Sequence, residues 1–515
     1  MNETTAVRAP SPFATVRDLT HMLRDRKISA VELLDLHLAR VRAVNPALNA
    51  VVALDEDGAR QQARRADEAL AAKKPLGPLH GLPMTIKDSF EVVGMPATCG
   101  IVALRDHRPR RDADAVEAVR AAGAVIFGKS NVPEGAGDHQ SYNPVYGLTR
   151  NPWNLGRSAG GSSGGAAAAV ASGMTPLEIG SDIGGSIRCP AHFCGVFGHK
   201  PSYGLVPMRG HIPPPPGCLS EAVMGVAGPI ARSAYDLELA LDLVARPNDL
   251  DRKGKVWRLP PPRRERLQDF RVALWADDKH YPVDPAYLAA IHAFADDLRK
   301  LGVKVNEARP QIDPLASDDI FVATLFGIWS NGLPEEQIRA YAAAMAGFAA
   351  DDRSWPARIG RAFGQNVRDW SRLQEKREHL MRAWVPFFGD HDVLIAPVMT
   401  TAAFPHDTSG HDHSAQLHRT IKVGSGTRPY LDNLMWPGLI TVAELPATAV
   451  PIRRMVDGVP VGVQVAGGFL EDRTTLCFAQ LVEEEFGGFI APDEKLFTAP
   501  LLALKKPAHG QLTCP

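Results

Sequence analysis

The chain reads Ser158-Ala159-Gly160-Gly161-Ser162-Ser163-Gly164-Gly165 and, shortly afterwards, Gly180-Ser181-Asp182-Ile183-Gly184-Gly185-Ser186-Ile187-Arg188-Cys189-Pro190. Clustered glycines cost chain entropy on folding, so they are expected where the backbone adopts a positive φ or approaches another group closely. Serines placed between such glycines indicate that these two stretches form a binding or catalytic site.

Two common glycine-rich sites fit these stretches poorly. A phosphate-binding loop needs Lys followed by Ser or Thr after its glycines, or the GxGxxG spacing after a strand, and neither is present. Ser163 is the centre of a formal G-x-S-x-G elbow, but the residues before it do not form the apolar strand that such an elbow follows. The second stretch can instead turn several backbone N–H groups toward one point beside Ser186. This favours a serine nucleophile with an oxyanion hole.

A serine nucleophile needs a base, and the residues leave two kinds of candidate open. His192 and His199 are close in sequence, but neither sits in a motif that defines its role. Lys87 ends the apolar run Leu82-Pro83-Met84-Thr85-Ile86. It is either a surface lysine that pairs with Asp88, or a lysine enclosed by apolar walls, whose pKa falls until the neutral amine acts as a base.

Three motifs, in this order, resemble those of the amidase signature family. They are Gly-Leu-Pro-x-x-x-Lys-Asp around Lys87, Gly-Gly-Ser-Ser-Gly-Gly around Ser162, and Asp-Ile-Gly-Gly-Ser-Ile-Arg around Ser186, separated by 75 and 24 residues. The resemblance extends from about residue 15 to residue 490 and is weakest over 285–380. It implies a single amidase domain over residues 1–515, with an α/β fold in which a central mixed, twisted sheet has helices on both faces.

The resemblance also implies the role of each site residue. It makes Ser186 the nucleophile, Ser162 a bridging serine preceded by a cis peptide bond, and Lys87 the base. The mechanism requires no metal and no cofactor. The implied oxyanion hole consists of the backbone N–H groups of Ile183, Gly184, Gly185 and Ser186, and the implied supporting residues are Ser163, Ser181, Asp182 and Arg188.

Patterns along the chain agree with an α/β protein. Residues 13–48 carry apolar side chains at mostly helical spacing, which predicts two helices with Ser29 as an N-cap, and helix-like stretches then alternate with β-branched runs. A Pro- and Arg-rich connection over 256–266 precedes a predicted strand at 271–275. Residues 285–385 are helical in pattern and rich in large aromatics. They predict a helical insertion whose aromatics form its own core or cap the active site.

The expected substrate pocket draws on three segments. Many family members carry an aromatic residue after the glutamate that corresponds to Glu134, whereas small residues follow here, which predicts a roomy site. A loop that contains Met208, Arg209, His211 and four prolines at 213–216 is expected at the mouth. The expected lining residues are Gly135, Ala136, Gly137, Met208, Arg209, Phe326 and Trp329.

The expected reaction is hydrolysis of the C–N bond of small-molecule amides through a seryl acyl-enzyme. A carbamate is electronically close enough to be attacked by the same groups, so a urethanase that cleaves aryl or alkyl carbamates, and also aryl esters, is the alternative. Less favoured are the amide-hydrolysing component of a tRNA-dependent amidotransferase, a histidine-dependent esterase of the α/β-hydrolase type, and a catalytically silent binding protein.

Composition argues against other partners. The 57 Lys and Arg residues nearly balance the 58 Asp and Glu residues, so the chain lacks the charge excess typical of nucleic-acid binding. The N-terminus has no signal-peptide pattern, and no apolar run reaches the ~18 residues of a membrane span. These patterns predict a cytoplasmic protein with no membrane partner, and the expected assembly is a monomer or a homodimer. The six cysteines are too sparse for a disulfide framework, and the spacing of Cys189, His192, Cys194 and Cys218 matches no standard zinc site.

Overall fold

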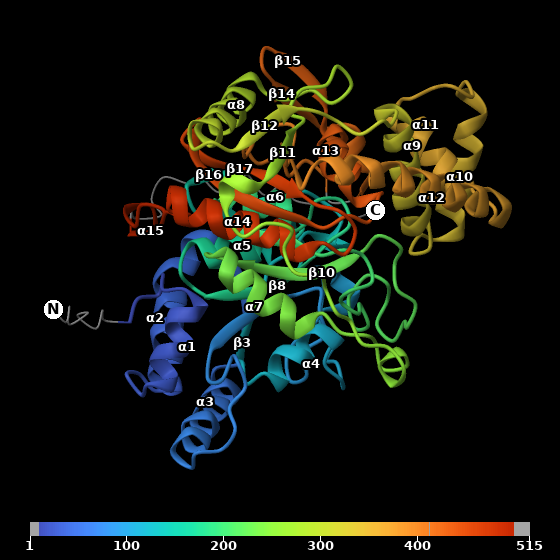
Figure 1. Ribbon diagram of the computed structural model, residues 1–515. Coiled ribbons are helices and arrows are strands. Elements are labelled where there is room, and N and C mark those ends of the chain that lie inside the picture. Colours follow the sequence, from blue (N-terminus) through green and yellow to red (C-terminus); the bar gives the residue numbers. More distant parts are fainter. Residues whose placement is uncertain (1–9, 411–412, 499–515) are drawn as a thin grey trace.

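An eight-stranded mixed sheet forms the centre of the protein in a computed structural model, which describes residues 10–410 and 413–498 (Figure 1). The strands in order across the sheet are β12 (Lys304–Glu307), β11 (Arg271–Leu274), β13 (Val393–Pro397), β17 (Val459–Ala466), β16 (Ala447–Val456), β9 (Phe197–Lys200), β10 (Val226–Ala231) and β8 (Leu177–Asp182). β11 runs parallel to both β12 and β13, and the other neighbouring pairs are antiparallel. The predicted α/β fold with a mixed sheet is confirmed.

A smaller sheet lies beside the edge strand β8 and carries Lys87. Its strands in order are β1 (Val51–Leu54), β3 (Val125–Ser130) and β2 (Pro83–Lys87). Thr85 of β2 donates its hydroxyl hydrogen to the Glu178 carboxyl group of β8 and its N–H to Thr175 Oγ1 at 3.2 Å. Because β2 and β8 end next to each other, Lys87 is placed beside residues 181 and 182.

Helices cover both faces of the central sheet (Figure 1). α5 (Gly164–Ala171) packs against α6 (Arg188–Cys194) on one face, and α7 (Ala234–Val244) packs against α14 (Asp472–Phe486) on the other. Near the N-terminus, Ser29 caps the second of two helices in a capping box, as the sequence predicts. The other helices of this body are α1 (Val16–Arg24), α2 (Ala30–Leu48), α3 (Glu56–Ala71), α4 (Asp114–Ala121), α8 (Pro285–Lys300), α13 (Met435–Thr441) and α15 (Lys495–Thr498). Short strand pairs complete it: β4 (Tyr142–Asn143) with β5 (Gly147–Leu148), β6 (Arg150–Asn151) with β7 (Asn154–Ser158), and β14 (Thr420–Val423) with β15 (Gly426–Pro429).

Four helices form a separate lobe at one side of the molecule (Figure 1): α9 (Pro314–Ser330), α10 (Glu335–Ala344), α11 (Trp355–Phe363) and α12 (Val367–Asp390). Aromatic side chains of α9 and α11 form much of its core, as expected from the sequence. The start of the lobe differs from the expected residue 285. The apolar face of α8 packs on the main core, and β12 pairs with β11 in the main sheet, so the lobe begins only at α9.

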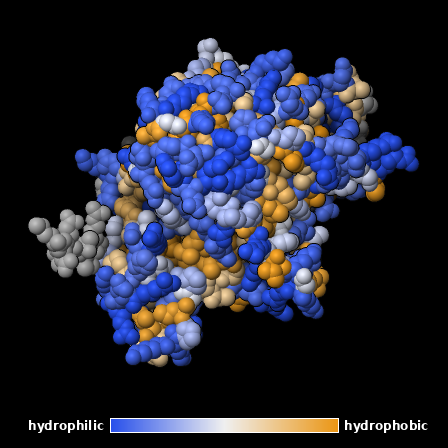
Figure 2. Space-filling model, viewed as in Figure 1, coloured by the Kyte–Doolittle hydropathy of each residue, from blue (hydrophilic) through white to orange (hydrophobic). Residues whose placement is uncertain are grey.

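Hydrophilic side chains dominate the face seen in Figure 2, and a cluster of hydrophobic ones lies between the helical lobe and the body. Within residues 10–410 and 413–498, no helix is both long enough and apolar enough to span a bilayer.

Arg188, the first residue of α6, joins four elements while it is completely buried. Its Nε and Nη2 donate to both carboxylate oxygens of Asp182 at 3.0 and 2.8 Å. Its Nη1 donates to the Pro437 carbonyl and to Gln464 Oε1, and Nη2 also donates to Thr441 Oγ1. Burial raises the pKa of Asp182, but the charge and hydrogen bonds of Arg188 outweigh burial and hold this pKa well below its usual range. The pair therefore stays ionised inside the fold.

Arg188→Met should lower the free energy of unfolding by about 3–5 kcal/mol, because it leaves the Asp182 carboxylate buried without its cation. Arg473→Met is the control, since Arg473 pairs with Glu238 and Asp242 near the surface and its loss should cost under about 1 kcal/mol. Thermal and urea unfolding followed by circular dichroism measures both effects. Equal shifts for the two variants would contradict the structural role of Arg188.

Candidate active site

Lys87 is fully buried at the end of β2, and its amine faces two serines. Its Nζ lies 2.7 Å from Ser162 Oγ and 2.8 Å from Ser181 Oγ. Burial lowers the pKa of Lys87 to about 7, against the opposing influence of nearby acidic groups. Glu178 adds little negative charge, because burial raises its own pKa to about 8. The amine is therefore neutral in a large fraction of molecules near pH 7, and the surface pairing of Lys87 with Asp88 is not observed.

Ser162 and Ser163 lie at the start of α5, where the first glycine-rich stretch turns into a helix. The peptide bond between Gly161 and Ser162 is cis, as the family resemblance implies. Ser163 connects the two glycine-rich stretches, because its N–H donates to the Ser186 carbonyl at 3.1 Å and its hydroxyl lies 3.4 Å from the Ser181 carbonyl oxygen.

The turn from residue 183 to residue 187 is held from both sides. Asp182 Oδ1 accepts the N–H of Gly185 at 2.9 Å, and Oδ2 accepts that of Ile187 at 3.0 Å. His139 Nε2 lies 2.9 Å from the Gly184 carbonyl oxygen on the opposite side. The turn is therefore fixed before any substrate binds.

These contacts decide which N–H groups remain available in the turn. Gly185 differs from the expected oxyanion hole, because its N–H already donates to Asp182. Among the described residues, the N–H groups of Ile183, Gly184 and Ser186 have no acceptor. They are the expected donors that are free to bind an oxyanion.

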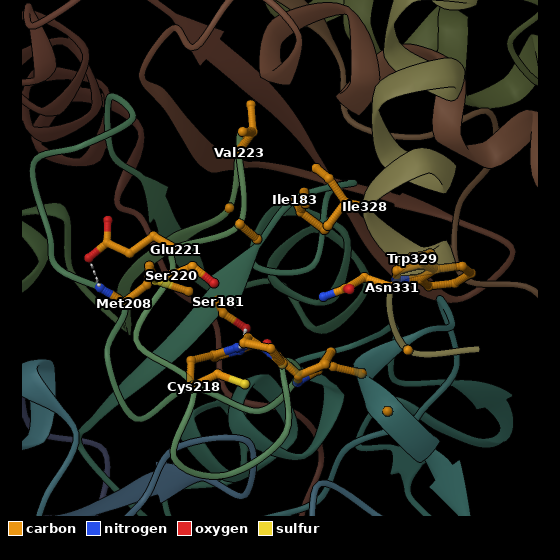
Figure 3. Close-up of a pocket in the computed structure, with 18 of the residues that line it drawn as sticks. Ser181, Ile183, Met208, Cys218, Ser220, Glu221, Val223, Ile328, Trp329 and Asn331 are labelled. Carbon is orange, nitrogen blue, oxygen red and sulfur yellow. Dashed lines mark hydrogen bonds between the residues drawn. The ribbon is translucent and has the colours of Figure 1, made fainter. Parts of the chain in front are cut away.

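A cavity of about 410 Å³ opens above Ser162, Ser181 and Ser186. Figure 3 shows its two walls. Met208, Cys218 and Ser220 come from the proline-rich loop, and they face Ile328 and Trp329 of α9 and Asn331, the C-cap of that helix. Five expected pocket residues line this cavity: Gly135, Ala136, Met208, Arg209 and Trp329. The other two, Gly137 and Phe326, line a smaller cavity that adjoins it.

His211 contacts the site, although sequence reasoning placed it only in the loop at the mouth. Its Nε2 lies 2.8 Å from Ser181 Oγ, and its Nδ1 lies 2.9 Å from the Pro213 carbonyl oxygen. Burial and the charge of Lys87 lower the pKa of His211 to about 3, so the ring is neutral at pH 7. A carbonyl only accepts hydrogen bonds, so Nδ1 carries the hydrogen and Nε2 accepts from the Ser181 hydroxyl. No motif marks this contact.

The two histidines considered as bases lie elsewhere. His192 is held between the N–H of Gly462 and the Thr401 carbonyl, and His199 bonds to Thr448 and Asp472. Neither histidine lines the main cavity. Within the described part of the chain, no cluster of three or more His, Cys, Asp or Glu side chains is arranged to hold a metal ion. The geometry therefore gives no support to a histidine-dependent esterase.

Comparisons with known proteins identify a family and several relatives. A family model described as Amidase matches residues 32–476. The chain is 33% identical to an indoleacetamide hydrolase of Bradyrhizobium diazoefficiens over 91% of this chain and 86% of that protein, and 32% identical to a component of the glutamyl-tRNA(Gln) amidotransferase of a Roseiflexus species over 90% and 94%. A crystal structure of an amidase superposes with a TM-score of 0.74 at 28% identity, over 92% of this chain and all of the other.

The family match covers Lys87 and both glycine-rich stretches, and the structure places Lys87 Nζ 2.7 Å from Ser162 Oγ. The chain therefore belongs to the amidase signature family of hydrolases.

Proposed function

We propose that the protein hydrolyses the C–N bond of small-molecule amides through an acyl-enzyme on Ser186. The observation that carries this proposal is the buried amine of Lys87, 2.7 Å from Ser162 Oγ at the base of a cavity that Ser186 also lines. A deprotonated lysine joined to a serine relay supplies the base that a serine nucleophile needs.

In the proposed acylation step, Ser186 Oγ attacks the carbonyl carbon and passes its proton to Ser162 Oγ. Ser162 passes its own proton to Lys87 at the same time. The negative charge that develops on the carbonyl oxygen is bound by the free N–H groups of the turn after Asp182. Because Asp182 and His139 hold this turn, the donors need no rearrangement during the reaction.

The proton then returns from Lys87 through Ser162 to the leaving nitrogen, which lets the C–N bond break. Amide nitrogen leaves poorly until it is protonated, so a relay aimed at this atom suits amides. Water attacks the acyl-enzyme by the same relay, and this step releases the carboxylic acid and restores Ser186.

Ser181 and His211 direct the lone pair of Lys87. His211 Nε2 accepts a hydrogen bond from the Ser181 hydroxyl. Ser181 Oγ can therefore act toward Lys87 only as a hydrogen-bond acceptor. A neutral amine has two hydrogens and one lone pair. Lys87 donates one of its hydrogens to Ser181 Oγ. Its lone pair is then free to accept a hydrogen bond from the hydroxyl of Ser162. His211 is in this sense a positioning residue.

Carbamates are the second candidate substrates. The same attack and proton return would release either the amine, which leaves an alkoxycarbonyl group on Ser186, or the alcohol, which leaves a carbamoyl group there. The cavity of about 410 Å³ beside Ser186 has room for the leaving half of such a carbamate, which supports this alternative. The similarity to the amidotransferase component also raises an ammonia-supplying role, which needs partner proteins. Turnover by the isolated chain separates these functions.

Ser186→Ala should lose at least about 10³-fold of the kcat of wild type on amides, because no other hydroxyl replaces the nucleophile. The assay uses an aryl amide, a primary amide, an aryl ester and an aryl carbamate, with mass spectrometry of the intact protein. Wild type should carry an acyl or carbamoyl adduct on Ser186. Full activity in Ser186→Ala would overturn the proposed function.

The pH dependence of kcat/KM should follow the ionisation of Lys87. Activity should fall tenfold per pH unit below the pKa of about 7, because protonation removes the base, and it should reach a plateau above that pKa. Lys87→Ala should lose this limb together with most of the activity. An identical pH profile in both proteins would show that Lys87 is not the base.

His211→Phe should lower kcat/KM about tenfold, since the Ser181 hydroxyl then donates to Lys87 and competes with Ser162 for its lone pair. His211→Gln keeps an acceptor and should recover part of the loss. His379→Phe is the control, because His379 lies on the exposed side of α12. A shift of the pH limb in His211→Phe, absent from the control, distinguishes positioning from a general loss of stability.

A further inference from the structure

Two cavities of very different size meet at Ser186. The main cavity has a volume of about 410 Å³, and the smaller one about 40 Å³. Four residues line both: Ala136, Ile183, Ser186 and Trp329. A carbonyl carbon bound at Ser186 therefore has one large and one small space for its two substituents.

The position of the proton relay decides which substituent occupies which space. Ser162 and Ser181 line the main cavity, whereas neither lines the small one. The leaving nitrogen must lie within reach of Ser162 to receive its proton, so the amine half belongs in the main cavity. The acyl half then points into the small cavity, beside Gly184.

The walls of the small cavity suit a short apolar group. Its apolar side consists of Leu325, Phe326, Leu431 and Leu434, which are buried in the core of the helical lobe and its neighbours. A cavity of about 40 Å³ has room for two or three atoms of carbon or water size.

Two polar side chains of the small cavity, Asp138 and Gln416, already bond to other protein groups. Asp138 binds Arg419 and the Tyr430 hydroxyl, and Gln416 donates to the Gly137 carbonyl at 2.7 Å. Among the described residues of this wall, no charge is left for an ionised acyl group. The acyl group that fits is therefore neutral as well as short.

The main cavity is wide, with apolar side chains on one wall and both apolar and aromatic ones on the other. Met208 and Val223 face Ile328, Trp329 and Trp370 across it (Figure 3 labels the first four). The positive charge of Arg209 is neutralised by Asp114. This space suits a bulky aromatic amine rather than ammonia.

We infer that the protein selects amides with a short apolar acyl group and a bulky aryl amine, and disfavours primary amides of bulky acids. This inference rests on the proposed hydrolysis at Ser186, and it adds the orientation of the substrate. Indoleacetamide, the compound in the name of one relative, has the opposite distribution of bulk. Its acyl half is bulky and its leaving group is ammonia.

The test varies one half of the substrate at a time. The 4-nitroanilides of acetic, propanoic, butanoic and hexanoic acids vary the acyl half, while acetamide, acetanilide and N-(2-naphthyl)acetamide vary the amine. Wild-type kcat/KM should fall more than about tenfold from the propanoyl to the hexanoyl anilide. It should rise from acetamide to the naphthyl amide, and indoleacetamide should be a poor substrate.

Two sets of variants should separate the cavities. Leu434→Ala or, separately, Leu431→Ala enlarges the small cavity and should reduce the propanoyl-to-hexanoyl difference to within about threefold. Val223→Phe narrows the main cavity and should penalise the naphthyl amide while the order of acyl lengths stays the same. Thermal unfolding of each variant shows whether it is folded, and the wild-type series tests the inference without any variant.

The outcomes are distinguishable from failure of the proposed function. A wild-type preference for hexanoyl over propanoyl anilides, or for indoleacetamide over acetanilide, would overturn the assigned orientation while hydrolysis at Ser186 stands. Turnover of no substrate, with no adduct on Ser186, would overturn both.

Discussion

The site depends on one physical constraint: the fold removes the amine of Lys87 from water. Lys87 is buried where β2 ends beside β8, and the nearest groups that it bonds are hydroxyls rather than carboxylates. A buried ammonium without a counterion is strongly disfavoured, so the free energy of desolvation is expressed as a lower pKa. The fold thereby provides a largely deprotonated amine near neutral pH, which is the base that we propose in place of a histidine. The two sheets must meet at this place, because either one alone would leave the amine in water.

The buried pair of Asp182 and Arg188 differs from Lys87, because both members keep their charge. Asp182 and Arg188 remain ionised because each satisfies the other and several backbone groups. Their pairing makes the turn around Ser186 rigid. One buried group is kept neutral so that it exchanges protons, and the other pair is kept charged so that it does not.

Much of this arrangement could be predicted from the sequence, because it depends on local pattern and on motifs. The β-branched runs at β13 and β17, the capped helix after Ser29, and the cis bond before Ser162 all follow from residues close in the chain or from the resemblance they carry. The start of the helical lobe could not be predicted, since a helical pattern does not show which surface its apolar face covers. The engagement of the Gly185 N–H by Asp182 depends on the three-dimensional course of the turn. The contact of His211 with Ser181 joins a loop to strand β8 across 30 residues, and no periodicity or motif encodes it.

Several contacts hold the proline-rich loop against the segment after Lys87, and they limit how the substrate preference of this enzyme can change. Glu91 N–H donates to the Gly210 carbonyl, Ile212 N–H donates to that of Ser89, and the rings of Phe90 and His211 stack edge to face, so the loop is fastened to the segment that follows Lys87. One wall of the main cavity is thus hydrogen-bonded to the segment that follows Lys87. The wall beside Gly184 comes from other helices. Over evolutionary time, substitutions in those helices can change the acyl preference, whereas a change of amine preference through the proline-rich loop must leave its contacts with the segment after Lys87 intact.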